Sequence, residues 1–397
     1  HVDHPRYFAF IPAPNNPIGA YADALAAGMN IFVGTWMVGA GATQVERVAI
    51  DWLRQLLGMP ETAGGLFVSG GSVANLVALT AARQHQLGDD FSRGVVYFSD
   101  QTHSCIERAL RLLGFRKEQL RVLPADEQFR LPIAALRAQI DADRASGWQP
   151  FCIVANAGTT NTGAVDPLPE LVELCRREGL WLHADGAYGA SMILTDEGRR
   201  LLQGISAVDS LAIDPHKSFY QPMAAGCTLV RVFEHLRDAF RILPPYLQDK
   251  EHGLLGVDLC DYGVELSRGF RALKLWMSLK VFGLEAFRQA MEHNLHLARY
   301  AESLLRERSN WQIVSPATLG IVAFRYAPPD LPEAQTDALN RALVDAMLTD
   351  GFALVSSTIL RGRVTLRMCP LNPRATEADV EETIKRLDQF ARTLAQS

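Results

Sequence analysis

Two residues of the chain have the types and the surroundings that one kind of chemistry needs. Asp185 follows the apolar run 180–184, and Lys217 follows the apolar run 211–213 with Pro215 and His216 before it. A carboxylate can keep the pyridine nitrogen of a bound pyridoxal phosphate (PLP) protonated, and a lysine can bind its aldehyde carbon as a Schiff base. The pair therefore indicates PLP chemistry that depends on Lys217.

Other polar side chains also follow short apolar runs. His103 comes after the run 95–98, and Thr160 comes after the run 151–155. In a parallel sheet the carboxyl ends of the strands meet at one edge, where ligands bind. We therefore expect His103, Thr160, Asp185 and Lys217 to lie at the same edge. An imidazole there could stack on a flat ring or move a proton near neutral pH.

A glycine-rich turn, Ser69–Gly70–Gly71–Ser72, lies between the apolar run 66–68 and a helix predicted to begin near Val73. Backbone amides at a helix N-terminus, together with a serine hydroxyl, can hold a phosphate. A tight turn with a serine N-cap explains the same residues. No Gly-Lys-Ser/Thr sequence follows, so the turn is not a P-loop.

The composition fits an ordinary globular enzyme. The net charge of −5 argues against nucleic acid or an anionic membrane surface as a partner. No apolar run reaches the roughly 18 residues of a membrane span. The six cysteines are scattered without a CxxC pair, so we expect no metal site and no disulfide framework. Reduced, buried thiols in a cytoplasmic protein are the expected state.

The order of the predicted elements indicates an α/β fold. Short apolar runs alternate with amphipathic stretches over residues 66–232, which is typical of a mainly parallel sheet covered by helices. Helices expected at 266–282 and 284–306 precede a mixture of strands and helices that indicates a smaller α+β domain. The predicted domains are an N-terminal arm, 1–41, a large PLP-binding domain, 42–299, and a small C-terminal domain, 300–397.

One helix start is also predicted from a local pattern. Thr43–Gln44–Val45–Glu46 has the form of a capping box, followed by apolar residues at helical spacing up to a stop near Gly58. The pattern predicts a helix that begins at Thr43, with the Glu46 side chain folded back onto the helix start.

Six motifs, in this order, resemble those of the group II PLP-dependent amino-acid decarboxylases, and most of all the aromatic-amino-acid enzymes. They are SGGSVAN (69–75), SDQTHSCIERA (99–109), NAGTTNTGAVD (156–166), LHADGAYGAS (182–191), DSLAIDPHKS (209–218) and RGFRALKLW (268–276). The opening segment 4–17 resembles the same family. The resemblance implies fold type I with a seven-stranded sheet, a homodimer with shared active sites, and an N-terminal helical segment ahead of His1.

The resemblance also assigns roles to individual residues. Lys217 is matched to the Schiff-base lysine, Asp185 to the pyridinium partner and His103 to the ring-stacking histidine that also meets the substrate. The remaining cofactor contacts that it implies are Gly71, Ser72 and His216 at the phosphate, Ala187 under the ring, Thr160 near the ring, and Asp214. Asp214 stands where the aromatic enzymes often have asparagine, and a carboxylate beside a phosphate is unfavourable unless it faces elsewhere.

The activity implied is decarboxylation. The substrate amine displaces Lys217, CO₂ leaves as electrons flow into the ring held by Asp185, and a proton returns to Cα. The family usually supplies that proton from a loop tyrosine, but Leu259 stands at the corresponding position. Tyr262 is the candidate donor, although simple packing explains it equally well, and Tyr246 lies further upstream.

The substrate pocket implied by the resemblance is apolar. Phe10, Pro12, Phe32 and Gly34 match its lining, and no Arg or Lys cluster is present to hold a second carboxylate. Glutamate and aspartate are therefore disfavoured. Gly34 replaces a bulky aromatic residue and is expected to leave room for a substrate such as tryptophan, or tyrosine or DOPA.

Two other functions remain open. Without the loop tyrosine, the chain could be an aldehyde synthase, which combines decarboxylation with oxidative deamination. It could also be a non-catalytic scaffold, although the presence of both Lys217 and Asp185 argues against that.

Overall fold

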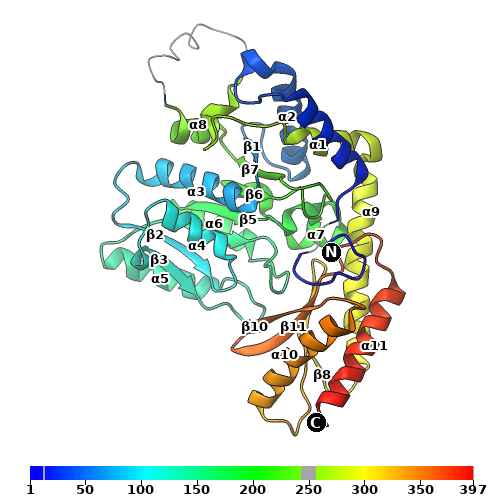
Figure 1. Cartoon of the computed structure of the whole chain (residues 1–397). Helices are drawn as coiled ribbons and strands as arrows, with labels where there is room; N and C mark the ends of the chain where they lie inside the picture. The colour runs from blue at the N-terminus through cyan, green and yellow to red at the C-terminus, as the bar shows by residue number, and fades with distance from the viewer. Residues whose placement is uncertain (12–13, 243–255, 397) are drawn as a thin grey trace. The chain divides into compact units, whose positions relative to one another are not determined.

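The chain folds as two compact units in a computed structural model, which describes residues 1–11, 14–242 and 256–396 (Figure 1). The larger unit comprises Asn15–Ala157 and Val165–Gly283, and the smaller comprises His1–Pro14, Gly158–Ala164 and Leu284–Ser397. These units are divided at other positions than residues 41 and 299, and the predicted domain boundaries stay a prediction. Each unit is described by itself.

The larger unit is built on a seven-stranded sheet with the order β1-β7-β6-β5-β4-β2-β3. Strand β7 runs antiparallel to both of its neighbours, and the other neighbouring pairs are parallel. The predicted mainly parallel sheet is therefore confirmed. Its strands are β1 (Gly64–Val68), β2 (Gly94–Ser99), β3 (Leu120–Leu123), β4 (Gln149–Asn156), β5 (Trp181–Asp185), β6 (Ser210–Ile213) and β7 (Gly226–Val230).

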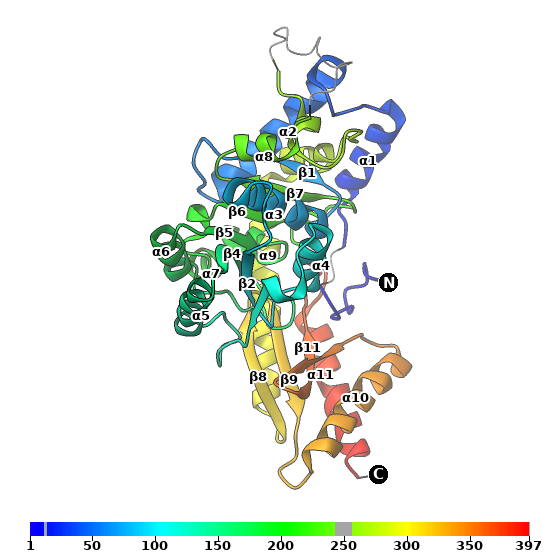
Figure 2. The same ribbon diagram turned by 90° about the vertical axis from the view of Figure 1, so that its left-hand side faces the viewer.

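Helices cover both faces of this sheet, which explains why its central strands are continuous apolar runs. Helices α3 and α4 pack on one face through a shared apolar cluster, and Figure 2 shows α5 and α6 on the opposite side. The helices of the unit are α1 (Pro17–Met29), α2 (Trp36–Leu56), α3 (Gly71–Leu87), α4 (Ser104–Leu112), α5 (Ile133–Ala145), α6 (Leu168–Glu178), α7 (Asp196–Leu201) and α8 (Glu234–Phe240).

The smaller unit has an antiparallel four-stranded sheet with the order β10-β11-β9-β8. Its elements are β8 (Trp311–Thr318), β9 (Ile321–Tyr326), β10 (Ser356–Leu360), β11 (Arg363–Met368), α10 (Glu333–Asp350), α11 (Glu377–Leu394) and the second part of α9 (Ala272–Arg306). Gly283 interrupts α9 with φ 73°, a value that glycine adopts readily. The predicted pair of helices meeting at this residue is confirmed.

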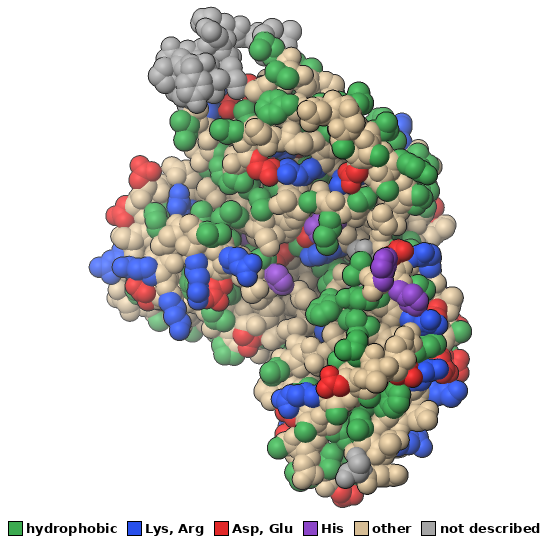
Figure 3. Space-filling view, viewed as in Figure 1, with side chains coloured by type: hydrophobic (Ala, Val, Ile, Leu, Met, Phe, Trp, Pro, Cys, Tyr) green, Lys and Arg blue, Asp and Glu red, His purple; other side chains and the backbone are tan. Residues whose placement is uncertain are grey.

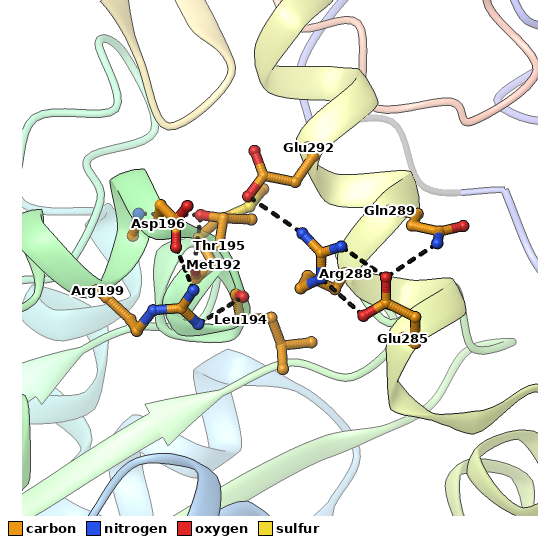
Figure 4. A network of polar contacts seen from close by, with 10 residues as sticks. Met192, Leu194, Thr195, Asp196, Arg199, Glu285, Arg288, Gln289 and Glu292 are labelled. Carbon is orange, nitrogen blue, oxygen red and sulfur yellow. Dashed lines mark hydrogen bonds and ion pairs between the residues drawn. The ribbon is translucent and has the colours of Figure 1, made fainter.

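Short-range polar contacts lie at the ends and on the surfaces of helices in each unit (Figure 4). In the larger unit, the Thr195 hydroxyl caps α7 by accepting from the Gly198 amide at 2.9 Å, and Arg199 pairs with Asp196. In the smaller unit, Arg288 donates to Glu285 on the same helix at 2.7 Å. Exposed pairs of this kind contribute little to stability.

A buried ion pair joins α2 to the segment that precedes α9, and both of its side chains also bind β1. Arg268 and Glu46 are both almost completely buried, and Arg268 also donates to the carbonyls of Val33 at 3.0 Å and Phe67 at 2.7 Å. Glu46 in turn accepts from the Phe67 amide at 2.9 Å. The predicted capping box is therefore wrong. Helix α2 begins at Trp36, so Thr43 lies inside it, and Glu46 points into the core.

Loss of one partner of this pair should destabilise the larger unit strongly. Arg268→Met leaves the Glu46 carboxylate buried without its counter-ion, which costs about 3–5 kcal/mol. We expect a matching loss in the free energy of unfolding measured in urea. Arg306→Ala, which breaks an exposed pair with Glu302, should cost less than about 1 kcal/mol. Equal losses in the two variants would contradict this expectation.

Candidate active site

The site is built from loops at the carboxyl ends of the parallel strands of the larger unit. Asp185 is the last residue of β5 and is 8% exposed. One of its oxygens, Oδ1, accepts from the Ala187 amide at 3.1 Å, and the other, Oδ2, faces the Cys105 thiol at 3.9 Å. Each carboxylate oxygen thus has one donor beside it, and the two contacts hold the side chain in one orientation.

Lys217 lies in the turn after β6 and is paired with Asp214. Its Nζ is 3.1 Å from Asp214 Oδ2, and His216 Nε2 is 3.6 Å from the same oxygen. The Lys217 amide also donates to the Asp214 carbonyl at 2.9 Å, which fixes the turn. Burial lowers the pKa of His216. The Asp214 carboxylate therefore faces the lysine, and its buried Oδ1 has no hydrogen-bond partner among the described residues.

The N-terminus of α3 offers donors for a phosphate. Gly70 is the N-cap of this 17-residue helix, its carbonyl already accepts from later amides, and no acceptor is found among the described residues for the amides of Gly71 and Ser72. The Ser72 side chain is exposed. Free amides at the start of a long helix, with a hydroxyl beside them, suit an anion.

Gly71 brings this helix start close to the lysine turn. A Cβ atom on Gly71 would lie 2.7 Å from Asp214 Oδ2 and 3.0 Å from Ala187 Cβ, and one on Gly70 would lie 3.2 Å from His216 Cε1. Only glycine permits such an approach. The site therefore combines helix amides, a buried carboxylate and a lysine, and these are the groups needed for the phosphate, the pyridine nitrogen and the aldehyde of PLP.

His103 is the N-cap residue of α4. Its Nδ1 accepts from the Cys105 amide at 3.3 Å, so the ring is held against the helix start while its other edge is exposed. This position follows β2 at the same edge of the sheet as Asp185. A stacking role for the ring stays a prediction.

Three of the predicted residues, Phe10, Pro12 and Thr160, belong to the smaller unit. The Thr160 carbonyl accepts from Arg367 at 2.7 Å, and the same guanidinium donates to the Phe10 carbonyl at 2.8 Å. Phe10 is 62% exposed and has φ 56°. Pro12 lies outside the described residues. The roles assigned to Thr160, Phe10 and Pro12 stay predictions.

The space expected beside Gly34 is filled by the chain itself. A Cβ on Gly34 would lie 2.2 Å from Cζ of Phe32 and 2.7 Å from the Leu266 carbonyl oxygen. The expectation that Gly34 leaves room for a larger substrate is therefore wrong, because the Phe32 ring occupies that room. Gly34 is needed for this close packing.

Tyr262 lies in the core rather than beside the lysine turn. It ends a short 3₁₀ helix, Leu259–Tyr262, and its ring stacks on Phe233 with centroids 4.1 Å apart and an interplanar angle of 5°. Burial is the main cause that raises the pKa of its hydroxyl. This packing does not favour its predicted role as proton donor, which remains a prediction. Tyr246 lies outside the described residues.

The sequence analysis did not identify three buried residues, Asn75, Cys105 and His183, that are linked by hydrogen bonds to Asp185. Asn75 Nδ2 donates to Cys105 Sγ at 3.3 Å, and Asn75 Oδ1 is 2.7 Å from His183 Nε2. His183 precedes Asp185 by two residues on β5, so both side chains point to the same face of the sheet. That spacing was the available signal.

Comparisons with known proteins agree with this site. The family model described as "Pyridoxal-dependent decarboxylase conserved domain" matches residues 1–327. The chain is 49% identical to an aromatic-L-amino-acid decarboxylase of Bacillus atrophaeus, over 98% of this chain and 82% of that protein. It is 33% identical to a phenylacetaldehyde synthase of Arabidopsis thaliana, over 98% and 82% respectively.

A solved structure has the same fold. The crystal structure of Oryza sativa TDC with PLP and tryptamine superposes with a TM-score of 0.93 at 31% identity, covering 99% of this chain and 85% of that one. The chain belongs to the pyridoxal-dependent decarboxylase family. It is a PLP-dependent amino-acid decarboxylase, as the motifs predicted.

Two further observations concern the whole chain. None of the helices in the described ranges has the length and apolar content that crossing a membrane requires. All six cysteines are buried, and none of them lies in a disulfide bond.

The close approach at Gly71 gives a direct test of the site. Gly71→Ala should push the Asp214 carboxylate away from Lys217 and crowd the helix amides, weakening PLP binding about tenfold through overpacking of about 1–3 kcal/mol. Titration of the apoprotein with PLP measures this. Gly269→Ala is the matched control, because a Cβ there meets nothing within 4 Å. Equal affinities for the two variants would count against the assignment.

Proposed function

We propose that this enzyme decarboxylates an aromatic L-amino acid to the corresponding amine and CO₂. The observation that carries the proposal is the convergence of Asp185, Asp214 and Lys217 on the free amides of α3, in a chain of the decarboxylase family. The aromatic substrate is supported by 49% identity to an enzyme of that specificity.

The protein's part in the reaction is to hold charges and protons at fixed atoms. Bound PLP supplies an aldehyde for the substrate amine and a ring that accepts electrons. Asp185 would hold the pyridine nitrogen of the bound cofactor from a buried position. Lys217 Nζ would bind the aldehyde carbon and would be the group that the substrate amine replaces. Asp214 Oδ2 lies 3.1 Å from that amine and would hold it in place when it is not linked to PLP.

The other predicted residues orient the reactants. Gly71 and Ser72 would bind the phosphate through helix amides, with His216 beside them, and Ala187 would contact the ring. His103 would stack on the ring and meet the substrate. Thr160 lies near the ring in this proposal. A fixed orientation of the bond that breaks is itself a large part of such catalysis.

The substrate side chain is proposed to be an aromatic ring such as that of tryptophan, tyrosine or DOPA. Phe10, Pro12 and Phe32 are apolar, and aromatic rings bind well against such surfaces. A second carboxylate would be buried there without a partner, which is costly. Since Phe32 fills the space beside Gly34, that glycine gives no reason to prefer tryptophan over the smaller rings.

An amino-acid panel tests the proposal. The PLP-loaded enzyme should convert tryptophan, tyrosine or DOPA with a kcat/KM at least about 100-fold above that for glutamate, since an unpaired buried charge costs several kcal/mol. Amine and CO₂ are scored together. Lys217→Ala should lose turnover and the covalent cofactor linkage while remaining folded. A clear preference for glutamate would overturn the aromatic assignment.

Aldehyde formation is the second candidate. The position of the family's loop tyrosine holds Leu259, which is almost completely buried. The nearby Tyr262 has its ring stacked in the core, so neither of these two described positions offers an exposed tyrosine. The likeness to a phenylacetaldehyde synthase supports the same candidate. The panel distinguishes the two products, because oxidative deamination consumes oxygen and releases ammonia and peroxide, whereas simple decarboxylation does not.

We further propose that the enzyme is a homodimer with shared active sites and acts in the cytoplasm. Large apolar side chains are exposed on the larger unit, on α1 and at the start of α2, and Figure 3 shows hydrophobic side chains over these helices. The most exposed of them are Tyr21 (66%), Met29 (65%), Met37 (77%) and Val38 (65%). Gathered apolar surface of this kind marks interaction sites. Six cysteines without a disulfide bond suit a reducing compartment.

Light scattering after size exclusion should give a mass about twice the 43.8 kDa of one chain. Charges introduced at the exposed apolar side chains, as in Met29→Glu with Met37→Glu, should shift the protein to monomers because each charge would be buried in the interface. Leu348→Glu is the matched control, a similarly exposed residue on α10 of the smaller unit. A monomeric wild-type enzyme would contradict the dimer.

A further inference from the structure

A line of hydrogen bonds runs through the buried face of the sheet beneath α3 and ends on Asp185. At its start the Trp181 indole donates from Nε1 to Ser210 Oγ at 2.8 Å, and Ser210 Oγ lies 2.8 Å from His183 Nδ1. His183 Nε2 lies 2.7 Å from Asn75 Oδ1. Two strands, β5 and β6, and one helix thus contribute successive members.

The second half of the line crosses from α3 to α4. Asn75 Nδ2 donates to Cys105 Sγ at 3.3 Å, and the Cys105 thiol donates to Asp185 Oδ2 at 3.9 Å. All five side chains that precede Asp185 are buried, none of them more than 6% exposed. Hydrogen bonds in such a setting are stronger than in water and polarise one another.

Every hydrogen bond in this line is donated in the same direction, from Trp181 toward Asp185. Asn75 gives its amide protons to sulfur, so its oxygen must accept, and His183 must carry its proton on Nε2. Nδ1 of His183 then accepts from the Ser210 hydroxyl, which itself accepts from Trp181. Burial lowers the pKa of His183 to about 4 and raises that of Cys105 to about 12. A neutral imidazole and a protonated thiol are the forms that this order requires.

We propose that Cys105, Asn75, His183 and Ser210 are positioning residues that orient the Asp185 carboxylate and donate to it, which favours the ring nitrogen as the position of the proton shared with the bound pyridine. This rests on the role proposed above for Asp185. The charged groups near Cys105 are Asp185, Asp214 and Lys217, and of these only Asp185 accepts the thiol proton. A thiol is a weak donor. It adds enough bias to matter where the proton is shared between two bases.

The test measures the ring nitrogen directly. PLP labelled with ¹⁵N in its ring is bound to the wild-type protein and to Cys105→Ala, Cys105→Ser and Ser210→Ala, and the ¹⁵N shift is recorded with the dissociation constant of PLP. Removal of the thiol should move the shift toward neutral pyridine and weaken PLP binding about fivefold, since a hydrogen bond to a charged group contributes at least about 1 kcal/mol. Cys105→Ser keeps a donor and should restore both values.

The remaining variants separate the possible failures. Ser210→Ala cuts the line far from Asp185 and should move the shift in the same direction by a smaller amount. Cys175→Ala, which removes a buried thiol from α6, should change neither value. If Asp185→Asn leaves the nitrogen protonated, the role of Asp185 is wrong. If Asp185→Asn deprotonates it but Cys105→Ala leaves the shift unchanged, only the hydrogen-bonded line is overturned.

Discussion

The active site depends on one buried carboxylate and on the groups that satisfy its two oxygens. Asp185 sits at the end of a central strand with little access to water, where a polar side chain is costly unless it is hydrogen-bonded. Two donors satisfy its oxygens: the Ala187 amide donates to one and the Cys105 thiol donates to the other. The sheet topology then brings Lys217 and the start of α3 to the same edge.

Two buried acids in the larger unit, Glu46 and Asp185, have carboxylates that are satisfied by different kinds of partner. Glu46 is compensated by a full opposite charge, Arg268, and serves packing between α2 and β1. Asp185 has only neutral donors and keeps its capacity for a cationic ligand. A cofactor with a protonated ring can therefore bind to Asp185 as its cationic partner, whereas Glu46 already has Arg268. Burial alone does not distinguish a structural acid from a functional one, but the charge of its partner does.

The sequence was most informative where strands end. Asp185, Lys217 and His103 each follow an apolar run, and parallel strands place such residues together, so most of the sheet and the core of the site could be predicted. Packing between residues far apart in the sequence could not be predicted. The pattern at Thr43 matched a capping box, but Glu46 is used by Arg268, more than 200 residues away. Gly34 suggested open space only because its neighbour Phe32 could not be placed from sequence.

All six thiols are enclosed in the folded chain, Cys105 among them. An alkylating reagent can therefore react only when a segment opens, and the rate at which each sulfur is labelled reports the opening of its own element. Cys105 on α4, Cys175 on α6 and Cys369 after β11 sample three separate parts of the protein. The native chain thus carries its own set of probes for local unfolding, without any engineered label.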